Sequence, residues 1–260
     1  MDTSRSAAVA AGQLGIDREQ SELEAGRRLV ISSDFHKACQ SLARIGGVDP
    51  LWCWAHMRRY FLRAGAAHPE ALGARADART ERIAVLYRAH HSLAATTPGT
   101  DAHEHARGRW QRAFTDIGAH RILQASSAGQ GLLHPAAAKV IATLNNEWDR
   151  LARHQHLPQL PLDSNTAERA LRTPVTGRKN FYGSGAERAA HLAADIWTIT
   201  ATAAQHGIEP LQLMADYLHA CAQAGGTAPA GAGLDSFLPW TPQGRARRSP
   251  ARSQRQGTGP

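Results

Sequence analysis

The sequence predicts an α/β protein that becomes mainly α-helical after about its first 60 residues. An apolar, β-branched run at residues 29–31 is followed by helical spacing over residues 36–45 and a second apolar run over residues 49–56. A strand, a helix and a strand within about 30 residues fit a βαβ unit with parallel pairing. From residue 57 onward, Ala- and Arg-rich segments repeat apolar residues at helical spacing. We therefore expect a small α/β start followed by a helical majority.

The individual elements follow from the spacing of apolar residues and from Pro, Gly and Ser breaks. A short helix is predicted at residues 5–16, and a buried strand at residues 29–33. The polar residues Ser32-Ser33-Asp34 mark the end of this strand. Gly46-Gly47 ends the helix of residues 36–45. The later helices are predicted at residues 57–66, 69–96, 101–125, 134–156, 186–206 and 210–224.

The chain is basic, but the charge is unevenly distributed. It has 260 residues and a formal net charge of +8, which suggests a polyanionic partner. Five arginines lie in residues 241–260, which contain no acidic residue, so residues 1–240 carry only +3. This Pro-, Gly- and Ser-rich tail is predicted to be disordered. The excess of Arg over Lys fits phosphate contacts, or a GC-rich genome.

Several classes of protein are excluded by composition. No apolar run approaches the roughly 20 residues of a membrane span, and the N-terminus lacks the apolar region of a secretory signal. Three cysteines are too few for a disulfide framework, so we expect a reducing cytoplasm. The His and Cys pairs lack the spacing of a structural zinc site, and we interpret them as core or surface residues: Cys53/His56, His103/His105 and His154/His156.

Two carboxylates are candidates for chemistry. Asp34 follows a strand, where ligands gather in α/β sheets, but it could equally cap the helix of residues 36–45. Asn165 and Glu168 have the spacing of a capping box, with Asn165 as the N-cap, and Pro174 is expected to end that short helix. Glu168 is therefore either a capping residue in the first turn or a catalytic acid.

Residues 177–185 form a basic, Gly-rich segment with two aromatic residues. Such a loop could bind phosphate through its basic residues and backbone amides while a base stacks on an aromatic ring. A solvated turn is the alternative interpretation. It lacks the spacing of a nucleotide-binding P-loop.

Three segments, taken in order, resemble the transposases of the insertion sequence 66 family. They are LVISSDF, WCWAHMRRYF and LPLDSNTAERALRTPVTGRKNFYGSG, and the resemblance runs from near residue 2 to about residue 240. It implies a catalytic core of the DDE type with an RNase H-like fold, in which three carboxylates hold two Mg²⁺ or Mn²⁺ ions. By motif, Asp34 would be the second acid and Glu168 the third. Ser164 stands where the family more often has Asn.

The resemblance also implies the surface that faces DNA. It lies beside the third acid and comprises Arg169, Arg172, Arg178, Lys179 and Asn180. Two further candidates, Arg58 and Arg59, lie on the segment of residues 57–66. Expected partners are DNA, both element ends and target, and a second copy or an intact transposase. The expected location is the bacterial cytoplasm, in association with the nucleoid.

The same resemblance places the first acid on an earlier strand. Asp2 and Asp17 follow no strand pattern, so we expect a C-terminal part of a transposase that is inactive alone. The expected organisation is an incomplete RNase H-like core at residues 1–60, a helical insertion at 61–160, core-completing helices at 161–240 and the tail at 241–260. A non-catalytic DNA-binding remnant and a decayed reading frame are the alternatives.

Overall fold

The computed structural model describes residues 7–35, 37–180 and 185–247. These fall into two compact units, an N-terminal unit that ends at Ala167 and a C-terminal unit that begins at Glu168. The described residues are mainly helical with one small parallel sheet, as the sequence predicts.

The N-terminal unit starts with the predicted βαβ unit. Helix α1 (Ala7–Leu14) precedes strand β1 (Leu29–Ser33), helix α2 (Lys37–Leu42) and strand β2 (Val48–Trp52). The two strands pair in parallel, with Leu29 opposite Val48 and Ser33 opposite Trp52, which confirms the predicted pairing. Gly47 has a φ of +83° and connects α2 to β2, so a residue with a side chain would be strained there.

The two strands differ in burial. Four of the five residues of β2 are buried, whereas β1 alternates between half-buried and exposed residues, and Val30 is 41% exposed. The prediction of a buried first strand is therefore wrong for one of its faces. The β2 prediction is also too long, because helix α3 begins at Trp54 and takes up the residues to His56.

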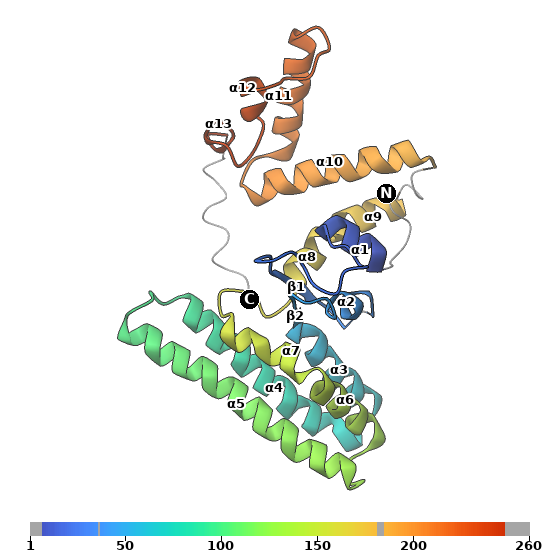
Figure 1. Cartoon of the computed structure of the whole chain (residues 1–260), viewed down its shortest axis with the longest axis vertical. Coiled ribbons are helices and arrows are strands. Elements are labelled where there is room, and N and C mark those ends of the chain that lie inside the picture. Colours follow the sequence, from blue (N-terminus) through green and yellow to red (C-terminus); the bar gives the residue numbers. More distant parts are fainter. Residues whose placement is uncertain (1–6, 36, 181–184, 248–260) are drawn as a thin grey trace. The chain divides into compact units, whose positions relative to one another are not determined.

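Four helices of the N-terminal unit pack around one core. They are α3 (Trp54–Ala67), α4 (Pro69–Ala94), α5 (Asp101–Gly129) and α6 (Pro135–Asn146), and each contacts two of the others in a closed ring. Figure 1 shows these helices side by side, next to the strands of the same unit. The predicted single helix at residues 134–156 is divided into α6, α7 (Trp148–Ala152) and the 3₁₀ turn Arg153–His156.

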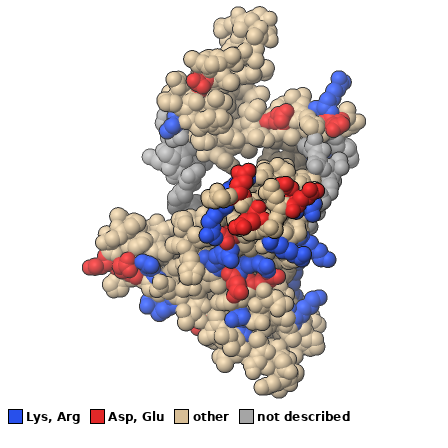
Figure 2. Space-filling view, in the orientation of Figure 1, with Lys and Arg blue, Asp and Glu red and all other residues tan. Residues whose placement is uncertain are grey.

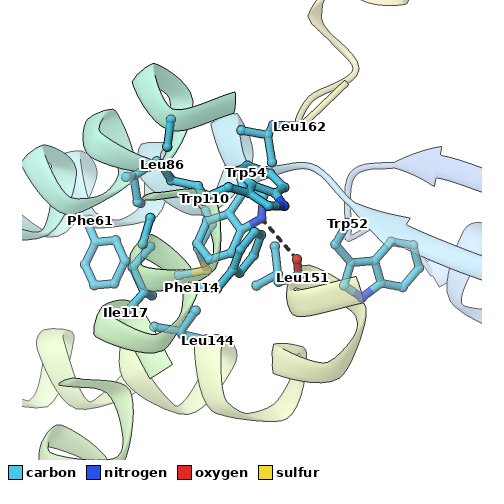
Figure 3. Close-up of a cluster of buried hydrophobic side chains, with 14 of the residues drawn as sticks. Trp52, Trp54, Phe61, Leu86, Trp110, Phe114, Ile117, Leu144, Leu151 and Leu162 are labelled. Carbon is cyan, nitrogen blue, oxygen red and sulfur yellow. Dashed lines mark hydrogen bonds between the residues drawn. The ribbon is translucent and has the colours of Figure 1, made fainter. Parts of the chain in front are cut away.

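Large aromatic side chains fill this bundle. Trp54, Trp110 and Phe114 are almost completely buried, and Trp110 meets Phe114 edge to face with ring centres 4.7 Å apart. Nε1 of Trp54 donates a hydrogen bond of 3.1 Å to the carbonyl of Leu151, so its polar atom is satisfied inside the core (Figure 3). The spacing of apolar residues on the predicted helices therefore marks this core.

The C-terminal unit is built from shorter helices around a small core. Ala203, Ile208 and Leu213 are buried, with Phe237 packed against them. Several large apolar side chains of this unit remain exposed, among them Leu192 and Leu211. The helices are α8 (Asn165–Ala170), which crosses the division between the units, then α9 (Arg172–Asn180), α10 (Glu187–Gln205), α11 (Pro210–Gln223), α12 (Ala232–Asp235) and α13 (Pro242–Arg245).

One sequence prediction for this unit is wrong, and a second is wrong for the first part of its range. Pro174 does not end a helix, because α8 already stops at Ala170 and Pro174 lies in the first turn of α9, where a missing N–H costs nothing. The tail predicted as disordered starts with a helical turn, in which Thr241 accepts a hydrogen bond from the N–H of Gly244 at 3.0 Å. Residues 248–260 lie outside the described ranges.

Candidate functional site at the carboxyl ends of the strands

Asp34 stands immediately after β1, at the carboxyl edge of the strand pair. The N–H of Cys53, which follows β2, donates a 3.0 Å hydrogen bond to the carbonyl of Ser33. The Ser33 hydroxyl donates to the carbonyl of Asp34 at 2.9 Å. Because parallel strands end at the same edge, the residues that follow β1 and β2 lie together there.

The segment before α8 joins this edge from more than 100 residues further along the chain. The N–H of Trp54 donates to the carbonyl of Leu162 at 3.0 Å, and the N–H of Ser164 contacts Sγ of Cys53 at 3.5 Å. These two bonds fix the segment on both sides of Asp163. The edge therefore holds two segments that bear carboxylates, one ending in Asp34 and one centred on Asp163.

Both carboxylate oxygens of Asp163 are engaged. Oδ1 accepts a 3.0 Å hydrogen bond from the N–H of Asn165, and Oδ2 accepts one of 2.8 Å from the hydroxyl of Tyr87 on α4. Burial raises the pKa of the Tyr87 hydroxyl, and the hydrogen bond to Asp163 raises it further, while the charge of Arg58 opposes this effect. Asp163 thus links the start of α8 to the helical bundle.

Asp163 is a residue that the sequence reasoning missed. An Asp whose side chain accepts from the backbone N–H two residues later is a common turn, and the Asp163-Ser164-Asn165 spacing offers that signal. Asn165, predicted as the N-cap, is the first residue of α8 and is the donor in this hydrogen bond.

Aromatic residues pack beside the carboxyl edge of the strand pair. Phe35, which follows Asp34, stacks on Tyr60 with ring centres 5.6 Å apart and meets Trp52 at 6.1 Å. The Trp52 carbonyl accepts a 3.1 Å hydrogen bond from Nε2 of the buried His154. Burial lowers the pKa of His154 to about 4, so this imidazole is neutral near pH 7. Asp34 is therefore followed by a residue that packs against the bundle core, beside the anchored end of β2.

The other predicted site residues lie on exposed helical surfaces. Arg58 and Arg59 are exposed on α3 in the N-terminal unit. Glu168 lies in the first turn of α8, in the C-terminal unit, and is exposed. The exposed basic and polar side chains that follow it are Arg169 on α8 and Arg172, Arg178, Lys179 and Asn180 on α9.

The basic segment at residues 177–185 begins inside a helix. Residues 177–180 form the last turn of α9, so the predicted loop is wrong for this half. Arg178 and Lys179 thereby stand at a helix C-terminus, where positive charge is favourable. The aromatic residues Phe181 and Tyr182 lie outside the described residues.

The described residues do not by themselves form a divalent metal site. Among them, no three His, Cys, Asp or Glu side chains are gathered so that they could hold a metal ion. Asp163 has both oxygens engaged in hydrogen bonds, and Asp17 accepts from the N–H of Glu19 in a turn that follows α1.

Charge at the surface is mixed in sign. On the face shown in Figure 2, basic and acidic side chains are interspersed over the part of the molecule that contains β1 and β2.

None of the described helices is long and apolar enough to cross a membrane.

Fold and site together define a class: a mainly helical protein in which a short parallel strand pair presents acidic residues beside a helical bundle. The model of the Transposase IS66 family matches residues 1–192, and the chain belongs to this family. It is also similar to a protein of Sinorhizobium fredii described as "Uncharacterized protein y4qI", with 25% identity over 188 residues. That match covers 72% of this chain and 33% of the relative, so the chain spans about a third of the relative's length. No solved structure matches the chain.

Proposed function

We propose that this protein takes part in DNA transposition as a DDE-type transposase chain, with Asp34 and Glu168 as two acids of the catalytic set. The observation that carries the proposal is the position of Asp34: it follows β1 at the carboxyl edge of a parallel strand pair, in a chain of the Transposase IS66 family. In this proposal, residues 1–60 and 161–240 contribute to an RNase H-like core, and residues 61–160 are a helical insertion.

Each group has a role in this proposal. Asp34 and Glu168 are the carboxylates offered to Mg²⁺ or Mn²⁺, which would supply charge stabilisation during attack on a phosphodiester. The Asp163–Tyr87 hydrogen bond holds the start of α8, the helix that carries Glu168. Exposed basic side chains of α8 and α9 contact DNA phosphates, which their positive charge favours. They are Arg169, Arg172, Arg178 and Lys179, with Asn180 beside them.

In this proposal, the three carboxylates of the catalytic set require one acid besides Asp34 and Glu168. The motifs of this chain supply a second and a third acid, whereas Asp17 lies in an exposed turn after α1 instead of at the end of a strand. Phosphoryl transfer at a two-metal site depends on the position of both ions. We therefore expect these 260 residues alone to bind DNA without cleaving it.

The test is a cleavage and binding assay with the full chain. Duplexes that contain the element ends and scrambled duplexes are incubated with Mg²⁺ or Mn²⁺, and both bound DNA and 3′-end nicking are measured. We expect binding and no specific nicking. Nicking that is lost in Asp34→Ala and Glu168→Ala, but kept in the control variants Asp17→Ala and Glu187→Ala, would show that the chain holds a complete acid set. Absence of any DNA binding would overturn the role in transposition.

A second candidate function is non-catalytic DNA binding. It is favoured by the exposed basic residues at the end of α9, Arg178 and Lys179, which suit phosphate contacts without any catalytic acid. Such a protein would compete with an intact transposase for element ends, or form mixed oligomers with it. In a strand-transfer assay with an intact transposase of the same element, addition of the chain would then inhibit the reaction in proportion to its concentration.

A further inference from the structure

A groove between α4 and α5 is lined by arginines that the site described above does not use. Its volume is about 550 Å³, and its charged lining consists of one carboxylate and four guanidinium groups: Asp116 with Arg82, Arg88, Arg109 and Arg112. The floor includes Ala89 and Ala113, each only 6% exposed. These small residues let the two helices approach closely, and the long side chains stand on both sides of them.

The two helices run antiparallel, which sets the spacing of the arginines. Arg82 of α4 pairs with Asp116 of α5, whereas Ser92, ten residues further along α4, meets Arg109 of α5 at 2.7 Å. Ten helical residues rise about 15 Å. One DNA strand advances about 3.4 Å per phosphate along the duplex axis, so the groove spans roughly four phosphates.

The arginines divide into one that holds the helices together and three that add positive charge. Arg82 is bound to Asp116 and also contacts Nε2 of His120 at 2.6 Å, so it joins α4 to α5. Arg88 pairs with Glu81 at 2.5 Å, but both side chains are more than 60% exposed, and such an exposed ion pair is weak. Arg88 therefore exchanges this partner for another anion at little cost.

Arg109 and Arg112 are the groove arginines that form no ion pair within the described residues. Arg109 donates to the neutral hydroxyl of Ser92, and neither arginine forms an ion pair with any residue in the described ranges. A Cβ on Gly108 would lie 3.3 Å from Nη1 of Arg112, so the guanidinium rests over a helix position that has no side chain. Both side chains are exposed at the rim of the groove.

We propose that this groove binds the phosphate backbone of duplex DNA, independently of sequence. The proposal rests on the proposed function in one respect, namely that the protein acts on DNA. Planar guanidinium groups suit phosphate oxygens, and the groove offers Arg88 from α4 together with Arg109 and Arg112 from α5. An acidic protein partner fits less well, because the floor offers alanines and no pocket for a large apolar anchor. The groove adds a second DNA contact to the basic surface of α8 and α9.

The experiment measures the salt dependence of DNA binding by the full chain. The Arg109→Ala/Arg112→Ala variant is compared with wild type, with the charge-preserving Arg109→Lys/Arg112→Lys variant, and with Arg107→Ala, an exposed arginine of α5 outside the groove lining. Each phosphate contact contributes about 0.9 to the slope of log K against log salt. We expect the double alanine variant to lose about 1.8 of that slope, the lysine variant to keep most of it, and Arg107→Ala to match wild type.

The outcomes separate the two proposals. Unchanged affinity and slope in the double alanine variant, with circular dichroism and melting like wild type, would overturn the groove proposal and leave the proposed function intact. Absence of DNA binding by wild type would overturn the proposed function and the groove proposal together. Binding of polyglutamate that the double alanine variant loses, while its DNA binding is unchanged, would instead assign the groove to an acidic protein.

Discussion

The hydroxyl of Tyr87 donates a 2.8 Å hydrogen bond to Oδ2 of Asp163, a residue 76 positions further along the chain. Through this bond a helix of the bundle holds the segment that leads into α8. The segment is also bound to Cys53 and Trp54 at the end of β2. The start of the helix that bears Glu168 is therefore positioned by two elements far away in sequence.

Replacing Tyr87 by Phe removes this hydrogen bond and keeps the ring. We expect a loss of about 1–3 kcal/mol in the free energy of unfolding, because a buried bond to a charged acceptor is lost. The folded-state pKa of Tyr87 is raised, so this side chain stabilises the fold below its ordinary pKa of about 10 and progressively less above it. Denaturant titrations at pH 7 and above pH 10 should show a smaller pH dependence in Tyr87→Phe. An identical pH dependence in both proteins would contradict the assignment.

Acid should destabilise the fold through His154. Its folded-state pKa is lowered to about 4 from an ordinary value of 6.5, and Nδ1 is buried without a hydrogen-bond partner. Because the unfolded chain takes up a proton first, stability is complete above pH 6.5 and falls as the pH drops toward 4. The expected loss is up to about 3 kcal/mol. His154→Gln should be less stable at pH 7.5 and should lack this contribution between pH 6.5 and 4, as measured by denaturant titration at each pH.

Two helical glycines should respond to alanine in opposite directions. A Cβ on Gly65 of α3 would lie 2.6 Å from the Cβ of Ala76 on α4, so Gly65→Ala forces the two helices apart. We expect a destabilisation of about 1–3 kcal/mol. Gly73 of α4 has open space around its Cβ position, so Gly73→Ala should stabilise the helix by about 0.5–1 kcal/mol. Thermal melts of both variants test the pair, and equal shifts would show that α3 and α4 do not pack as described.

Arg247, the last described residue, should hold residues 241–247 against the rest of the C-terminal unit. Its guanidinium pairs with Asp216 on α11, donates to the carbonyl of Ser236 at 2.8 Å and lies 4.8 Å from the ring centre of Phe237. Arg247→Ala should therefore increase protease cleavage within residues 236–247. Arg245→Ala serves as the control, because the guanidinium of Arg245 donates to the nearby Trp240 carbonyl and does not contact Asp216, Ser236 or Phe237. Equal cleavage of the two variants would argue against this anchor.

The sequence by itself determined the elements and the family. Apolar residues at helical spacing predicted α4 and α11 to within two residues at each end, and the β-branched run of β1 predicted a parallel strand before α2. These predictions succeed because local spacing decides which face of an element is buried. The order of the motifs likewise identified the family that the match to residues 1–192 shows.

Only the tertiary structure decided which distant residues meet. In the sequence, Asp163 is one of several polar residues before a helix, whereas in the folded protein Tyr87 of α4 binds it. The arginines of the groove are spread over residues 82–112 and come together only because α4 and α5 pack antiparallel through alanines. The prediction of disorder is wrong for residues 241–247 for the same reason: their composition disfavours folding, yet Arg247 contacts Asp216 of α11 and Phe237. Contacts between segments far apart in the chain depend on packing, which no local pattern encodes.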